Sequence, residues 1–195
     1  MKCARSVLAI GLAFLFLSQL SAQEKMKMPG GIQGSFLKLQ SAVEKESVSL
    51  AGAIPQDKYT WRPMEGVRSI SEAFLHLALG NYLIMQIIGV KLPEGIDLKT
   101  YQTSTTDKAK IVDALKASFA FVDEQVGKIP DSDLDREADF FGNKMTVRDL
   151  IVESGYHEHE ILGQAIAYAR MNQIVPPWTA ERQSKMKEQK AKEEK

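Results

Sequence analysis

The chain is short of several residue types that mark particular classes of function. It has one cysteine, Cys3, and three histidines, and its 25 basic residues equal its 25 acidic residues in number. Nucleic-acid-binding proteins usually carry a basic excess or stripe, so this balance predicts no nucleic-acid partner. The sequence also contains no internal repeat, heptad coiled coil or glycine-rich phosphate loop. These absences direct attention to the three histidines.

The N-terminus has the three-part layout of a secretory signal peptide. Lys2 and Arg5 give a basic start, an apolar run covers residues 7–17, and "SQLSAQ" follows. The apolar run is shorter than the roughly 20 residues that span a bilayer. We expect cleavage after Ala22, so that 1–22 is removed and the mature protein is exported to the periplasm or the medium, without membrane association. The mature chain then has no cysteine, which excludes disulfides and thiol nucleophiles.

Four helical patterns of about 20 residues each predict an all-α protein. They cover residues 33–53, 69–89, 106–128 and 146–172. The economical arrangement is a four-helix bundle over residues 33–178, preceded by a flexible lead-in at 23–32. The last stretch, 179–195, is charged on all sides and is expected to be a solvated tail or a frayed helix.

Local signals mark the starts of two of these helices. Ser69 with Glu72, and Thr146 with Asp149, have the spacing of a capping box, in which each side chain satisfies a free backbone donor. A short hairpin is also predicted around "GN" at 142–143, just before the last helix.

The histidines differ in the direction that helical geometry gives them. His157 and His159 are two residues apart, which is about 200° of rotation, so they cannot chelate one ion together. His157 falls on the apolar seam of its helix and His159 lies nearly opposite. We predict that His157 faces the interior and His159 the solvent. His76 lies in a helix that is apolar nearly all round and is predicted to be at least half buried. The seam of the last helix comprises Val147, Leu150, Ser154, His157, Ile161, Gln164, Tyr168 and Met171.

Two interpretations of His76 and His157 remain open from the residues alone. Each could be a core histidine whose ring nitrogens bond a carbonyl group or water. Alternatively, bundles build metal sites from side chains on facing helices, and neutral imidazole is a common ligand of zinc, nickel and copper. A catalytic site of that kind usually has three protein ligands and one open position, and the spacing supplies only two histidines.

Two stretches of the chain resemble the DinB-like superfamily. They are "KYTWRPMEGVRSISEAFLHLALGN" at 58–81 and "MTVRDLIVESGYHEHEILGQAIAYARMNQIVPPW" at 145–178. The resemblance implies an up-down four-helix bundle with a long crossover connection. In similar proteins three histidines bind a divalent ion, often nickel or zinc. His76 and His157 match two of these positions, but the third falls at Ile161, which cannot ligate a metal.

Glu160 is the nearest substitute for the missing ligand. It lies three residues after His157 on a neighbouring part of the same face, so the expected metal ligands are His76, His157 and Glu160. His159 would fit only if the helix were locally overwound or bulged. Glu158 or Glu160 could act as a base, although an exposed, salt-bridged glutamate is the more ordinary role for either.

The resemblance also carries an expectation about function. Relatives with known activity suggest thiol-dependent transfer or isomerisation. Export argues against a thiol cofactor, because such thiols are mainly cytosolic, and leaves a metal-dependent hydrolase or transferase acting on a small molecule. The alternative is a degenerate, non-catalytic bundle that acts as a small-ligand-binding or structural module. Some relatives dimerise, so a homodimer is compatible with the resemblance.

Overall fold

A computed structural model describes residues 29–194 of the chain. The predicted signal peptide, and residues 23–28 of the lead-in, lie outside these described residues. Four long helices form the body, and their bounds agree with the predicted ones to within a few residues. They are α1 Gly31–Ala53, α2 Ile70–Ile87, α3 Lys108–Val126 and α4 Val147–Met171. The other elements are η1 Gln56–Lys58, η2 Tyr101–Thr103, η3 Asp131–Asp133, β1 Glu137–Phe140, β2 Asn143–Thr146 and α5 Pro177–Glu193.

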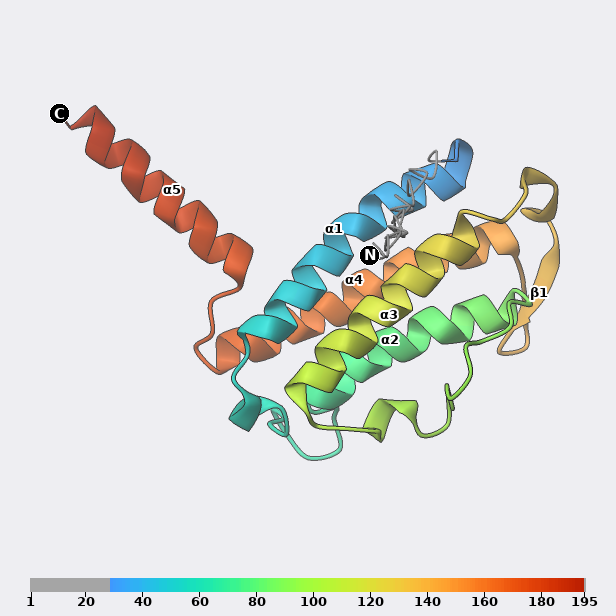
Figure 1. The fold of residues 1–195 in the computed structure, drawn as a ribbon, viewed down its shortest axis with the longest axis horizontal. Helices are drawn as coiled ribbons and strands as arrows, with labels where there is room; N and C mark the ends of the chain where they lie inside the picture. The colour runs from blue at the N-terminus through green and yellow to red at the C-terminus, as the bar shows by residue number, and fades with distance from the viewer. Residues whose placement is uncertain (1–28, 195) are drawn as a thin grey trace, which may run out of the picture.

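The four long helices form a bundle in which α3 and α4 each pack against both α1 and α2 (Figure 1). Helices α1 and α2 are therefore diagonally opposed. In Figure 1, α1 and α4 run in one direction and α2 and α3 run in the other. The long connection at 88–107 carries the chain back along the bundle between the parallel helices α2 and α3. This arrangement confirms the predicted all-α bundle with a long crossover.

Both predicted capping boxes are present. The Ser69 hydroxyl accepts from the Glu72 backbone N–H at 3.3 Å, and the Glu72 carboxylate accepts from the Ser69 N–H at 2.7 Å. Thr146 and Asp149 make the matching pair of bonds at 3.1 and 3.0 Å. Each box satisfies two backbone donors that the first turn of a helix leaves unpaired, which fixes where α2 and α4 begin.

The predicted hairpin forms immediately before α4. Strands β1 and β2 pair in antiparallel register, from Phe140 opposite Asn143 to Glu137 opposite Thr146. The two residues between the strands are Phe141 and Gly142, with φ of 53° and 85°, so the turn lies one residue earlier than the sequence indicated. Positive φ at both central positions matches the twist of two-residue hairpins, and glycine adopts it without strain.

The interior of the bundle consists of two apolar clusters with a polar layer between them. One cluster surrounds Leu50, Phe74 and Phe119, and the other surrounds Met85, Val122 and Leu150. Each long helix contributes to both clusters. Helices α1, α2 and α4 carry buried polar side chains between their two contributions, and α3 carries Ser118 next to Phe119, near the boundary between the clusters. We call this layer the polar belt, and it comprises Gln40, Asn81, Ser118, Ser154 and Glu158. Because buried polar groups need partners, the belt is a costly place to leave a polar atom unpaired.

The charged C-terminal stretch is an ordered helix, α5, that projects away from the bundle (Figure 1). Pro176 is its N-cap and Pro177 its first residue, a position where the missing backbone donor costs nothing. Trp178 is partly buried against the apolar cluster around Leu50. Within residues 29–194, no helix combines the length and the apolar character needed to cross a bilayer.

Candidate metal centre

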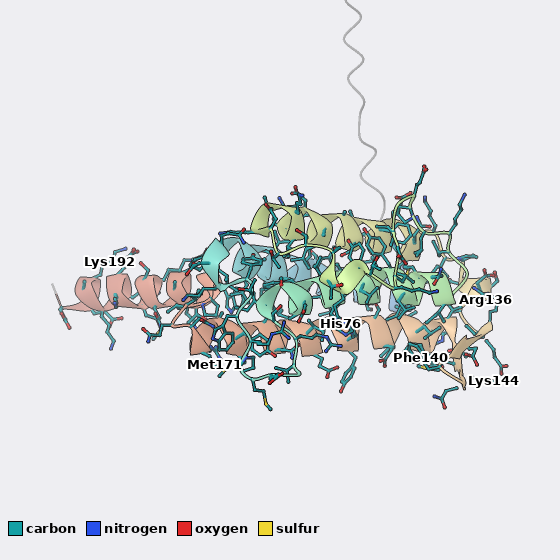
Figure 2. The ribbon with its side chains drawn as sticks, turned by 90° about the horizontal axis from the view of Figure 1, so that it is seen from below. His76, Arg136, Phe140, Lys144, Met171 and Lys192 are labelled. Carbon is teal, nitrogen blue, oxygen red and sulfur yellow. The ribbon has the colours of Figure 1, made fainter. Side chains whose placement is uncertain are left out.

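His76 on α2 and His157 on α4 meet across the interface between these helices. Their Nε2 atoms are 3.2 Å apart, and the ring centroids are 5.0 Å apart with the rings inclined at 67°. His76 lies about midway along the bundle (Figure 2). Both rings are partly buried. The sequence predicted that His157 faces inward and that His76 is at least half buried, and the structure brings the two histidines together.

Gly80 makes room for the His157 ring. It lies one helical turn after His76 on α2 and is buried. A Cβ atom at this position would lie 2.2 Å from Cε1 and 2.4 Å from Nδ1 of His157. Real Cβ atoms do not approach other atoms that closely, so any other residue here would displace the imidazole. The pair therefore depends on glycine at position 80 because of space, since this glycine has ordinary helical backbone angles.

The surroundings keep both imidazoles neutral. Burial lowers the pKa of His76 to about 4, and the positive charges of Arg68 and of a protonated His157 act in the same direction. Burial also lowers the pKa of His157; the negative charge of Glu160 opposes this effect, and Arg68 adds to it. Neutral rings expose nitrogen lone pairs, which is the form in which histidine ligates metals.

The geometry of the pair fits a divalent ion. Two nitrogens that each lie about 2.0–2.1 Å from one tetrahedral ion are about 3.3 Å apart, close to the observed separation. The same separation also suits a hydrogen bond from one neutral ring to the other. The Nδ1 atom of His157 is buried without a protein hydrogen-bond partner. The side chain of Gln102 lies close enough to His76 to act as a hydrogen-bond partner, which raises the pKa of that ring against the effect of burial. Orienting partners of this kind are a usual feature of metal-ligating histidines.

The third ligand position is apolar. Ile161 lies one turn after His157 and is buried, with 4% of its surface exposed. Glu160 is exposed, but its charge acts on His157. His159 is exposed, as predicted. Between residues 29 and 194, no three histidine, aspartate or glutamate side chains lie in an arrangement that would hold a metal ion. The structure thus joins His76 with His157 and does not place Glu160 with them as a ligand set.

Two positions on α4 differ from the sequence interpretation. Glu158 was expected in the ordinary role of an exposed, salt-bridged glutamate, but its side chain is fully buried and accepts from Gln40 Nε2 at 2.8 Å. Met171 was placed on the inward seam but is 60% exposed, because the helix ends there and leaves the bundle. Glu158 is buried because α4 packs against α1 as well as α2, so the buried arc of the helix is wider than one seam.

Sequence reasoning also missed two residues beside the histidines. Arg68 precedes α2, and its charge acts on both rings. Its Nε donates to the side chain of Gln102, in η2 of the long crossover, at 3.3 Å. Gly80 was equally unmarked. Both follow from α2 and α4 lying side by side, which the helical pattern of a single segment does not reveal.

Comparison with known proteins places the chain in a family. A family model of the DinB superfamily matches residues 41–165, which is more than half of the chain and includes both His76 and His157. The protein therefore belongs to the DinB superfamily.

Solved structures agree with this assignment. A DinB-like protein from Bacillus cereus ATCC 10987 is 19% identical with a TM-score of 0.63, over 73% of this chain and 93% of that one. A DinB-like protein from Bacillus subtilis, YjoA, is 25% identical with a TM-score of 0.56, over 72% and 93% of the two chains. A conserved protein from Enterococcus faecalis is 14% identical with a TM-score of 0.58, over 73% and 97%. None of the curated proteins matches.

Proposed function

We propose that this DinB-superfamily protein binds a divalent metal ion, nickel or zinc, through His76 and His157. The observation that supports this most directly is the 3.2 Å approach of the two Nε2 atoms, from separate helices, over a glycine that leaves space for the ring. A core histidine needs no such partner. Two neutral imidazoles facing one point form a pair of converging lone-pair donors, which suits a borderline cation.

The same proposal includes a metal-dependent hydrolase or transferase activity on a small molecule. A divalent ion held by these histidines would supply Lewis-acid chemistry. Arg68 is close enough for its charge to act on both rings, and it would orient an anionic or polarised group of a substrate. Glu160 is the protein group proposed as the third ligand, supported by the effect of its charge on His157.

Metal titration of the protein tests this proposal. We expect the protein to bind Ni²⁺ or Zn²⁺ in isothermal titration calorimetry. His76→Ala and His157→Ala should each weaken binding by about tenfold or more, because each removes one of two protein nitrogens. His159→Ala is the matched control, since it removes the remaining, exposed histidine of the same helix. Equal binding by all four proteins, or no binding by any, would refute the proposal.

A specific observation favours a second candidate. Ile161 fills the position where the family resemblance places a third histidine, so the site could be a degenerate relic in a non-catalytic ligand-binding or structural module. Ile161→His separates the two candidates. If the variant gains stoichiometric metal while the unaltered protein binds none, the natural chain has lost the site. If both bind, and the variant only more tightly, the two-histidine site is functional.

We also propose that the protein is exported after cleavage behind Ala22. The support is the basic, apolar and small-polar order of the first 22 residues. Expression of the full chain with fractionation and N-terminal sequencing tests this. Mature protein that begins at Gln23 outside the cytoplasm is the expected result, and an intact N-terminus in the cytoplasm contradicts it.

A further inference from the structure

Arg68 is a cation beside the histidine pair whose charge no acidic side chain balances. It immediately precedes the N-cap of α2, and it is half-buried. Within the described part of the chain, every salt bridge joins other residues. Arg62, for example, pairs with Glu72, and Arg148 pairs with Asp135. A half-buried guanidinium without a counterion has lost hydration and gained no ion pair, so an anion that reached it would be stabilised.

A hydrogen bond from the crossover fixes the direction of this guanidinium. Arg68 Nε donates to Oε1 of Gln102 at 3.3 Å. Gln102 lies in η2, which packs against α2, and its neighbour Tyr101 contacts Tyr82 of α2 edge-on, with ring centroids 5.6 Å apart. Among the described residues, the hydrogen bonds made by arginines include none from the two Nη nitrogens of Arg68. These nitrogens therefore present a fork of donors that suits two oxygens of one group.

The same guanidinium lies close to both imidazoles. Burial is the main reason for the lowered pKa of His76, and the positive charge of Arg68 adds to it. The charge of Arg68 also lowers the pKa of His157, where the negative charge of Glu160 opposes the effect of burial. Charge effects of this kind fall off with distance. An anion bound at Arg68 therefore lies beside the histidine nitrogens.

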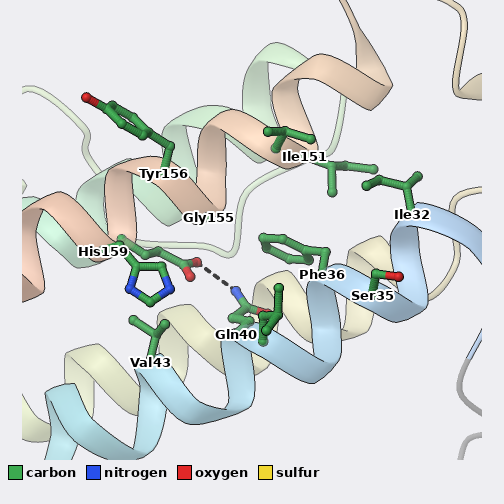
Figure 3. Close-up of a pocket in the computed structure, with 12 residues that line it drawn as sticks. Ile32, Ser35, Phe36, Gln40, Val43, Ile151, Gly155, Tyr156 and His159 are labelled. Atoms are coloured by element: carbon green, nitrogen blue, oxygen red, sulfur yellow. Dashed lines mark hydrogen bonds between the residues drawn. The ribbon is translucent and has the colours of Figure 1, made fainter.

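The other side of α4 offers no comparable charge. A groove of about 330 Å³ lies there between α1 and α4, lined mainly by apolar side chains such as Phe36 and Ile151 (Figure 3). Its buried polar residues, Gln40 and Glu158, are joined by the hydrogen bond drawn as a dashed line. Neither arginine nor lysine is among its lining residues. Of these two sides of α4, only the one that faces α2 offers a positive charge to an anionic ligand.

We propose that Arg68, held by Gln102, is a carboxylate site, and that the substrate of the histidine pair is a small carboxylic acid. The location of the reacting group rests on the proposed function, whereas binding of the carboxylate requires only Arg68. One guanidinium matches the single charge and the two coplanar oxygens of a carboxylate. A phosphate carries about −1.5 to −2 charges near neutral pH and would also be repelled by Glu160. The second polar group of the acid then faces His76 and His157.

Three small probes test the carboxylate site in the metal-free protein. Lactate carries a carboxylate, lactamide is its neutral isostere, and inorganic phosphate is the competing anion. Chelator-treated protein is titrated at low ionic strength, because salt screens a partly exposed ion pair, and binding is followed by amide chemical shifts in NMR spectra. Lactate should bind about tenfold or more tightly than lactamide, because only the carboxylate accepts charge-assisted bonds. Equal affinity for lactate and lactamide, no lactate binding at millimolar concentration, or tighter binding of phosphate than of lactate would overturn the proposal.

Two variants locate the site. Arg68→Gln removes the guanidinium and should abolish the preference for lactate over lactamide. Gln102→Glu keeps the guanidinium and the size of its partner but places a carboxylate of the protein against it, so lactate should be excluded. Arg148→Gln is the matched control, because it removes the same charge from an exposed ion pair at the start of α4. Unchanged lactate binding in both site variants, or an equal loss in the control, would contradict the assignment.

Titrations with and without zinc separate this inference from the proposed function. Lactate binding by the metal-free protein that Arg68→Gln abolishes supports the carboxylate site, whether or not zinc binds. Zinc binding together with equal affinities for lactate and lactamide leaves the metal site in place and overturns the carboxylate site. Where zinc and lactate both bind, zinc should tighten lactate binding in the unaltered protein but not in His157→Ala. An unchanged lactate affinity on zinc loading would show that the two ligands occupy separate sites, and it would overturn the substrate assignment.

Discussion

The side of α4 that faces α2 and the side that faces α1 each place a polar residue at a helix interface, but the two residues differ in chemistry. His157 points toward α2 and meets His76, while its neighbour Glu158 points toward α1 and meets Gln40. On each side, one polar group from α4 contacts one from a facing helix. The α2 side presents ring nitrogens near the cation Arg68, and the α1 side presents oxygens near two further carboxyl groups.

Burial shifts the pKa values of His76 and Glu158 in opposite directions. It lowers the pKa of His76 to about 4 and raises the pKa of Glu158 to about 8, the latter also through Asp123 and Glu44. Because burial disfavours whichever form is charged, the histidine loses its proton and the glutamate retains one near neutral pH. A polar layer in a bundle can thus hold a nitrogen site and an oxygen site one residue apart without a net buried charge.

The largest expected effect is on how stability depends on pH. Glu158 binds its proton more tightly when folded than when unfolded, where its pKa is near 4.5. Its contribution to stability is therefore full below pH 4.5 and is lost as the pH rises through 8, on the order of 5 kcal/mol in all. Glu158→Gln should flatten this slope in urea unfolding curves measured from about pH 5 to 9. An unchanged slope would show that Glu158 does not titrate across this range.

A smaller effect is expected from filling the space beside His157. Gly80→Ala forces the new Cβ atom against the ring, which should cost about 1–3 kcal/mol of folding stability through overpacking and weaken metal binding. Gly163→Ala, at an open site on α4, should gain up to about 1 kcal/mol from helix propensity. Thermal unfolding of both variants measures the difference. Equal melting temperatures would mean that His157 moves aside freely.

The smallest effect is expected from weakening the capping box at the start of α4, which lies far from the polar contacts of this helix. Thr146→Ala removes one half of the capping box at the start of α4 and should cost about 1 kcal/mol. The affinity of the histidine pair for metal should change by no more than about twofold, because the cap is several turns away. Calorimetry at a temperature where the variant is fully folded measures this affinity. A larger loss would show that the position of His157 depends on the first turn of α4.

The sequence predicted the elements of this fold because their signals are local. The spacing of Ser69 with Glu72 and of Thr146 with Asp149 marks helix starts, and a step of about 200° separates His157 from His159 whatever surrounds the helix. The turn of the hairpin lies one residue earlier than predicted, because Phe141 adopts positive φ together with Gly142.

The parts that sequence reasoning missed depend on which helices are neighbours. Glu158 lies about 100° from His157, outside a single seam, and it is buried only because α1 packs on that side of α4. Gly80 stands out in the sequence only by its small size, and its role becomes visible when the His157 ring lies over it. Side-chain periodicity gives a direction within one helix, but it does not say what lies in that direction.

The geometry of α5 has a consequence for how the molecule unfolds. None of its 17 residues is buried, and Trp178 is its main attachment to the apolar interior. The hydrogen bonds of this helix are therefore exposed to water along nearly its whole length, and isolated helices of this size are marginal. Its amides should exchange with solvent long before those of the bundle, so that the chain behaves as one cooperative body with a separately fraying arm.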